Sequence, residues 1–206
     1  MRTWSGDVRT KHPATYKDVL RAPENQVAEL IGRTLYLSPR PKGPQASVAA
    51  YLGANLITRF GSGGGGRNRW LILAEPELHL GQRVVVPDLA GWKRRRMNEV
   101  PLGHKFTIVP DWVCEIASPG TATHDRHNKM PLYAEAGVKH VWLITPLPKM
   151  LEVYRLVKQQ WVFIGTHVGN ERVRAEPFDD ALLSLSRLWS DIPKKASEPY
   201  EAYYAR

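Results

Sequence analysis

The chain has 206 residues, 43% of them apolar and 24% charged, which fits one soluble globular domain with a buried core. Lysine and arginine number 29 against 20 acidic residues, and the net charge of +9 favours polyanionic partners without proving them. One cysteine excludes an intrachain disulfide and a cysteine-based zinc site, and the absence of any apolar run of roughly 20 residues predicts a cytoplasmic protein that spans no membrane.

The first part of the chain contains two predicted helices separated by a strand and a loop. Apolar residues at helical spacing predict a short helix over 23–31, and a strand over 34–37 follows. The proline-rich segment 38–44 predicts a loop. An apolar residue at every fourth position predicts an amphipathic helix over 46–60. The glycine-rich stretch 61–66 lacks the Gly-Lys-Ser/Thr of a phosphate-binding loop, so it is interpreted as a flexible connector.

The rest of the chain is rich in short strands. They are predicted at 70–73, 77–80, 83–86, 89–92, 112–117, 141–144, 151–157 and 161–164. A helix over 123–136 ends at Gly137, and the leucine-rich segment 181–189 is expected to pack back on the core. The polar tail, 190–206, is either an interaction arm or disordered. These elements predict one α/β domain over 1–206, with a mixed sheet flanked by helices.

Carboxylates occur at positions where a purely structural protein seldom has them. Asp88 ends an apolar strand, Glu115 lies inside the most apolar strand, and Glu75 and Glu77 lie at a strand junction. Burying a carboxylate costs several kcal/mol unless it is paired, hydrogen-bonded or bound to metal. If the two strands pair, their alternation lets Asp88 and Glu115 converge on one Mg²⁺, which binds one or two carboxylates together with water and phosphate.

A lysine on the helix that follows is the third candidate. Lys129 lies four residues after Asp125, on a face that becomes apolar towards Tyr133, so it could point into a cleft beside the sheet. There it would orient a water molecule or stabilise charge on a phosphate. His124 and His127 have no third metal ligand in view and are expected to be solvated.

Each of these candidates also has a structural interpretation. Asp88 could only begin a turn, and Glu115 could be the buried partner of an arginine. Lys129 could extend to solvent or pair with Asp125 on the helix surface. Cys114 lies on the strand face opposite Glu115 and is expected to pack in the core.

Basic side chains follow the strand that begins after Asp88. The run Lys93, Arg94, Arg95 and Arg96 is either a solvated loop or a contact for the backbone phosphates of a nucleic acid. Arg126, on the helix, would extend this surface.

Several segments, in order, resemble the core signature of the Uma2 group of the PD-(D/E)XK nuclease superfamily. They are Val86-Pro87-Asp88-Leu89-Ala90, Pro110-Asp111-Trp112-Val113-Cys114-Glu115-Ile116-Ala117-Ser118-Pro119, Asp125, Lys129, Tyr133-Ala134-Glu135-Ala136-Gly137-Val138 and Val141-Trp142-Leu143-Ile144. The resemblance spans about residues 15–190 and implies a restriction-endonuclease-like fold, a central mixed sheet with helices on both faces.

The resemblance also implies roles for individual residues. Asp88 and Glu115 would bind the metal with Glu75 as an auxiliary acid, and Glu29 would correspond to the acid of the first core helix. The superfamily usually has a lysine two residues after the glutamate. That position is Ala117 here, so Lys129 becomes the candidate lysine. A histidine that many relatives have near positions 44–45 is absent.

The function implied is a Mg²⁺- or Mn²⁺-dependent endonuclease that hydrolyses phosphodiester bonds in DNA. A nucleic-acid-binding or partner-binding protein with little or no catalysis is the alternative, and a hydrolase of small phosphoesters is a third reading. Cutting both strands would be easier for a homodimer, whose twofold axis matches that of the duplex.

Overall fold

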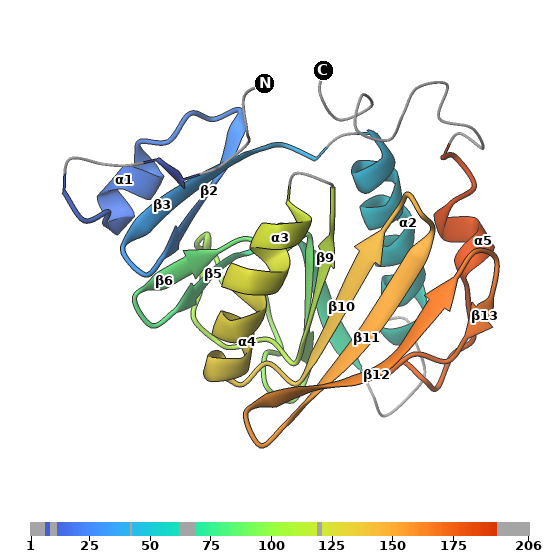
Figure 1. Cartoon of the computed structure of the whole chain (residues 1–206). Helices are drawn as coiled ribbons and strands as arrows, with labels where there is room; N and C mark the ends of the chain where they lie inside the picture. Colours follow the sequence, from blue (N-terminus) through green and yellow to red (C-terminus); the bar gives the residue numbers. More distant parts are fainter. Residues whose placement is uncertain (1–6, 9–11, 42, 62–68, 119–120, 193–206) are drawn as a thin grey trace.

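A computed structural model describes residues 7–8, 12–41, 43–61, 69–118 and 121–192 (Figure 1). Most of the predicted glycine-rich connector and of the polar tail lies outside these ranges. No helix in the described part of the chain is long and apolar enough to cross a membrane.

The central sheet has six strands and mixed direction. Its order is β12-β11-β10-β9-β7-β4, and β9 and β10 run parallel while the other neighbours are antiparallel. The strands are β4 (Trp70–Ala74), β7 (Leu89–Lys93), β9 (Trp112–Ile116), β10 (His140–Thr145), β11 (Met150–Val157) and β12 (Gln160–Val168). The predicted α/β class with a mixed sheet is confirmed.

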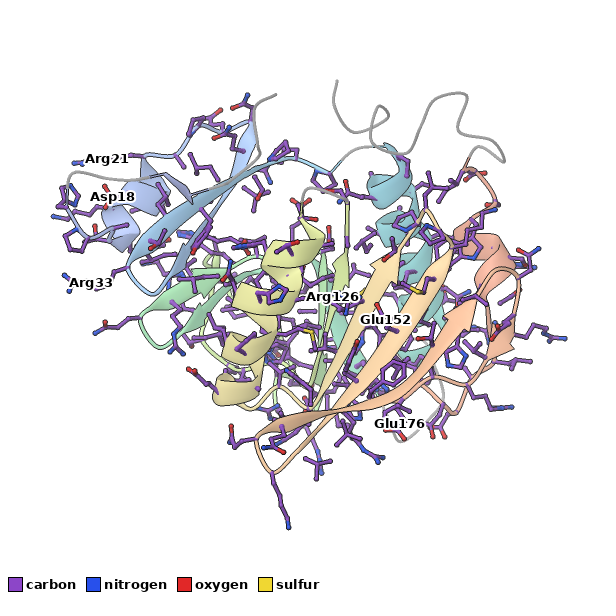
Figure 2. All side chains as sticks on the ribbon, viewed as in Figure 1. Asp18, Arg21, Arg33, Arg126, Glu152 and Glu176 are labelled. Carbon is purple, nitrogen blue, oxygen red and sulfur yellow. The ribbon has the colours of Figure 1, made fainter. Side chains whose placement is uncertain are left out.

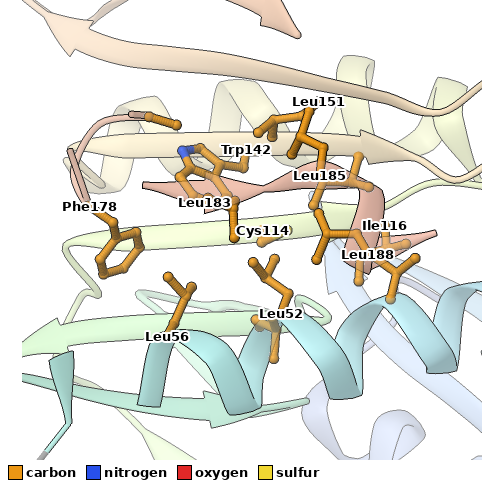
Figure 3. Close-up of a cluster of buried hydrophobic side chains, with 14 of the residues drawn as sticks. Leu52, Leu56, Cys114, Ile116, Trp142, Leu151, Phe178, Leu183, Leu185 and Leu188 are labelled. Atoms are coloured by element: carbon orange, nitrogen blue, oxygen red, sulfur yellow. The ribbon is translucent and has the colours of Figure 1, made fainter. Parts of the chain in front are cut away.

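Helices cover both faces of this sheet. On one face, α2 (Gly43–Phe60) and α5 (Leu185–Leu188) pack on β9 and β10, and Cys114 is buried in this core (Figures 1 and 3). On the other face lies a continuous helix made of α3 (Ala122–His124), the π-helical turn η1 (Asp125–Lys129) and α4 (Met130–Ala136). It ends at Gly137, whose φ of 86° is the left-handed conformation that glycine adopts freely. The packing predicted for Cys114 and for segment 181–189 is confirmed.

A second sheet lies beside the first, towards the N-terminal part of the chain (Figure 1). Its order is β1-β3-β2-β6-β5-β8. The strands are β1 (Asp7–Val8), β2 (Gln26–Ile31), β3 (Thr34–Pro39), β5 (Glu77–Leu80), β6 (Arg83–Val85) and β8 (Lys105–Phe106). A short helix, α1 (Tyr16–Leu20), precedes β2, and a small hairpin of β13 (Arg172–Val173) and β14 (Leu183–Ser184) precedes α5.

The predicted helix over 23–31 is wrong, because this segment forms strand β2. Gly32 and Arg33 both have positive φ, 57° and 68°. They form the two-residue turn of a β-hairpin in which Ile31 pairs with Thr34. Gly32 is the first residue of this turn.

The loop predicted over 38–44 is shorter than expected. Strand β3 continues to Pro39, which pairs with Gln26 at the end of the ladder. Helix α2 begins at Gly43 and has Pro44 in its first turn, where a proline loses no helical hydrogen bond.

Candidate active site

Two acids meet where the central sheet adjoins the second one. The apolar strand before Asp88 is β6, which pairs with β2 and β5 in the second sheet, so it does not pair with the strand of Glu115. Strand β7, which follows Asp88, is antiparallel to β9 instead, with Leu89 opposite Cys114. Asp88 precedes β7, where the chain has just left the second sheet, and its Oδ2 accepts a hydrogen bond of 2.6 Å from the Ile116 backbone N–H. Glu115 is 2% exposed and lies on the β9 face that packs under α4. The two acids therefore lie at the same end of the β7–β9 pair.

Lys129 lies at the centre of this group and is 3% exposed. Its Nζ is 2.8 Å from Oε1 of Glu115 and 3.0 Å from Oε1 of Glu29, and it donates to the Val86 carbonyl at 3.2 Å. Asp125 Oδ1 is 4.0 Å away. The prediction that Lys129 points inward beside the sheet is confirmed, and both alternatives, extension to solvent and a surface pair with Asp125, are wrong.

The local helix geometry contributes to this placement. Asp125 and Lys129 are the first and last residues of η1, and both are buried. A π-helical turn inserts an extra residue into an α-helix, changes the direction of the side chains around it, and often occurs at functional sites.

Glu29 comes from the second sheet and not from a core helix, so the helical position implied for it is wrong. In β2 its Oε1 accepts the backbone N–H of Val86 at 2.8 Å, and its Oε2 lies 3.1 Å from Nε2 of His124. One carboxylate thus ties the second sheet to the helix that carries Lys129.

His124 is not solvated as expected. Its side chain is 16% exposed, its ring packs against Tyr36 with centroids 4.6 Å apart, and Nδ1 lies 2.9 Å from the amide of Asn128. An amide N–H donated to Nδ1 leaves Nε2–H to donate to Glu29, so His124 serves as a hydrogen-bond partner within the site. His127 is exposed, as expected.

Two further polar residues belong to the site and are not identified as site residues from the sequence, one in contact with Glu115 and one with the backbone beside it. The hydroxyl of Tyr133 donates to Oε1 of Glu115 at 2.5 Å, and Nε2 of Gln45 donates to the Ile116 carbonyl at 2.8 Å. Tyr133 follows Lys129 by one helical turn, a spacing that could have pointed to it. The buried amide of Gln45 fixes the end of β9.

Burial dominates the electrostatics of the acids. It raises the pKa of Asp88 to about 7, with the charge of Glu115 adding to the effect. Burial also raises the pKa of Glu115 despite Lys129, and burial together with the charge of Glu115 raises that of Asp125. Burial acts in the same direction on Glu29, but Lys129, His124 and the Val86 N–H together lower its pKa to about 2. Four acids therefore surround one lysine, and ionising all four together is unfavourable.

This arrangement fits a divalent cation. Asp88, Glu115 and Lys129 line a cavity of about 60 Å³, room for roughly two water molecules. Within the described ranges, no group of three or more His, Cys, Asp or Glu side chains is arranged to hold a metal ion. A cation here would rely on one or two carboxylates, water and substrate phosphate, which is how Mg²⁺ is commonly bound.

Glu75 lies at the rim of the same cavity. Its backbone N–H donates to the Asp88 carbonyl at 3.1 Å, and its side chain, 38% exposed, pairs with Arg40 at 3.0 Å. The auxiliary position implied for Glu75 is thus near the acids, although its carboxylate is directed to an arginine.

The predicted phosphate-binding residues do not join the acids. The run from Lys93 to Arg96 begins with the last residue of β7, about 17 Å of extended chain from Asp88. Asp111 accepts the Lys93 backbone N–H at 2.9 Å and pairs with Arg96 at 2.9 Å, and Arg94 donates to the Asn98 carbonyl at 2.5 Å. Arg95 is exposed. This run is therefore not placed to contact a phosphate bound at Asp88 and Glu115.

Arg126 is also directed away from the acids. Its guanidinium pairs with Glu152 on β11 and donates to the Tyr154 hydroxyl at 3.2 Å (Figure 2). Its position on η1 therefore turns it towards β11, while Lys129 turns inward.

Comparison with known proteins identifies a family and a similar solved structure. A family model described as "Uma2: Putative restriction endonuclease" matches residues 13–186. The crystal structure of "a putative nuclease belonging to DUF820" from Anabaena variabilis is similar in fold, with a TM-score of 0.67 and 23% sequence identity, and the match covers 86% of this chain and 98% of that one. No match was found among curated proteins.

Proposed function

Because the chain belongs to the Uma2 family of restriction-endonuclease-like proteins, we propose that it is a divalent-metal-dependent endonuclease that hydrolyses phosphodiester bonds in DNA. The observation that carries this proposal is Lys129, buried between Glu115 and Glu29 beside a cavity that Asp88 lines. Burying several ionisable groups costs stability, and apolar side chains of similar volume would stabilise the fold at least as well. A functional role accounts for their presence better than a structural one.

Asp88 and Glu115 would hold Mg²⁺ or Mn²⁺, with Glu75 as an auxiliary acid at the rim. A bound divalent cation supplies charge neutralisation of the phosphate and a more acidic water. The surplus of buried acids over bases supports this assignment, because a cation would relieve the repulsion between Asp88 and Glu115 when both are ionised.

Lys129 acts as a cation in this proposal. Burial disfavours its charged form, but Glu115 and Glu29 raise its pKa well above the ordinary value. A protonated lysine cannot accept a proton, so it would instead donate hydrogen bonds that orient the attacking water or stabilise charge on the phosphate. Tyr133 and Glu29 are positioning residues in this proposal. Tyr133 orients Glu115, and Glu29 holds Lys129 and His124 in place.

One observation favours the alternative, a nucleic-acid-binding protein without turnover. Lys129 already contacts two carboxylates, and the superfamily's usual lysine position is occupied by Ala117. Salt-sensitive DNA binding with no cleavage in any metal would support this alternative.

The proposal is tested by incubating supercoiled and single-stranded DNA with the protein in Mg²⁺, Mn²⁺ or EDTA. We expect nicking or degradation with a metal and none in EDTA. Equal product in EDTA, or no product in either metal, would contradict the proposed activity.

A homodimer is proposed only for cutting both strands of a duplex. Sedimentation of the protein with and without duplex DNA would test whether it forms.

A further inference from the structure

A second hollow, of about 540 Å³, lies between α2 and strand β4, and we call it the α2–β4 groove. The helix wall is made of small side chains at successive turns, Ala46, Ala50 and Ala54, all of them exposed. Ile57 closes this wall, and Leu73 contributes to the strand wall. The groove is therefore mainly apolar and open, with a volume in the range that holds small organic groups.

The groove and the acid cavity are continuous. Pro41, Glu75 and Asp88 line both of them. Arg40 also lines the groove, where its guanidinium pairs with Glu75 at 3.0 Å. A ligand whose phosphate is bound by a metal ion at Asp88, beside Arg40, would thus extend an adjoining group into the apolar part.

Strand β4 adds polar groups to an otherwise apolar wall. It is an edge strand, and among the described strands it pairs only with β7. Ile72, Leu73, Ala74 and Glu75 all line the groove, although successive residues point to opposite faces. The groove therefore meets the backbone edge of β4, where N–H and C=O groups can bind a ligand.

Apolar walls, a polar strand edge and, at one end, the carboxylates proposed to hold a metal ion together fit one kind of group. A nucleobase has apolar faces and a polar rim, and in a DNA strand it is attached to the sugar next to a phosphate. We infer that the α2–β4 groove binds one unpaired nucleobase beside the phosphate at Asp88 and Glu115. This inference rests on the proposed function and narrows its substrate to single-stranded or locally unpaired DNA, because a stacked, paired base cannot enter such a groove.

Filling the groove tests the inference. Ala50→Leu puts a larger side chain on the exposed helix wall, and Thr58→Leu makes a comparable change on an exposed α2 position outside the groove. The probes are a labelled twelve-nucleotide oligothymidylate and the same sugar-phosphate backbone without bases, measured by fluorescence anisotropy in Ca²⁺ and in EDTA. The wild type should bind the base-bearing strand about tenfold more tightly than the backbone. Ala50→Leu should abolish that preference, and Thr58→Leu should keep it.

The outcomes separate this inference from the proposed activity. Equal affinity of the wild type for the two probes, or an unchanged preference in Ala50→Leu, would overturn the groove assignment whether or not DNA is cut. A base preference lost only in Ala50→Leu would support the assignment even if no metal supported cleavage. Should Ala50→Leu fail to fold, Ala54→Met fills the same wall one turn further along and takes its place.

Discussion

Nζ of Lys129 lies 2.8 Å from Oε1 of Glu115, and both side chains are almost completely buried. The same ammonium is 3.0 Å from Glu29, which belongs to the other sheet. One cation thus joins the central sheet, the second sheet and the helix that carries it. Stability and proposed chemistry therefore depend on the same contacts.

Replacing Lys129 by methionine should weaken folding as well as cleavage. The substitution leaves Glu115 and Glu29 buried without their cation, and breaking a buried pair in this way costs about 3–5 kcal/mol. Urea unfolding at pH 7 measures the loss. Lys129→Arg, which keeps the charge, should recover part of the stability, and an unchanged free energy of unfolding in Lys129→Met would contradict the central position of this lysine.

Asp88 should destabilise the metal-free protein at alkaline pH. Its pKa is raised from 3.8 to about 7, so its contribution to stability is complete below pH 3.8 and is lost as the pH rises through 7. In EDTA at pH 8, Asp88→Asn should therefore raise the free energy of unfolding by about 2 kcal/mol.

Two further measurements complete the test of Asp88: unfolding with added Mg²⁺, and the same unfolding experiments on a control variant. Adding Mg²⁺ should stabilise the wild type and not Asp88→Asn. Glu135→Gln, an acid on the exposed side of α4, should change neither result. A destabilised Asp88→Asn in EDTA would show that the carboxylate is a net structural contact.

Glu29 should have the opposite pH dependence. Its pKa is lowered from 4.5 to about 2, so its contribution is present above pH 4.5 and is lost as the pH falls towards 2. Glu29→Gln should lower the melting temperature at pH 7 and flatten the decline between pH 4.5 and 2. Thermal melts of both proteins across this range provide the measurement, and parallel curves would rule out a charged Glu29 beside Lys129.

Tyr133→Phe keeps the packing under α4 and removes only the hydrogen bond to Glu115. Groups that orient a metal-binding residue in this way commonly contribute about 10–100-fold to metal affinity or activity. We expect the Mn²⁺ concentration needed for half-maximal cleavage to rise by about that factor, with little change in melting temperature. An unchanged metal requirement would restrict Tyr133 to packing.

The sequence was most informative where side-chain period and burial coincide. Alternation predicts that Glu115 and Cys114 point to opposite faces of their strand, and the structure confirms it. The convergence of Asp88 and Glu115 depends instead on the pairing of β7 with β9, because the strand before Asp88 belongs to the second sheet. The helix predicted over residues 23–31 is wrong because Val27, Leu30 and Ile31 fit helical spacing as well as a strand. The backbone angles of the Gly32–Arg33 turn make this segment one arm of a β-hairpin, and the apolar spacing does not contain that information.

Contacts between distant segments could not be predicted in this way. His124 meets Glu29 across 95 residues, and nothing in local periodicity indicates it. The run from Lys93 to Arg96 is close to Asp88 in sequence, yet β7 carries it to the opposite end of the sheet. A short sequence separation is therefore a poor guide to distance when an extended strand intervenes.

The central claim is that Asp88 and Glu115 form a metal-dependent nuclease site. The most direct measurement is cleavage of single-stranded and supercoiled DNA in Mg²⁺ and Mn²⁺ by the wild type, Asp88→Ala, Glu115→Ala and the control Glu135→Gln. We predict metal-dependent cleavage by the wild type and Glu135→Gln, and none by the other two at equal folded concentration. Cleavage that survives either alanine substitution, or that fails in the wild type with both metals, would contradict the claim.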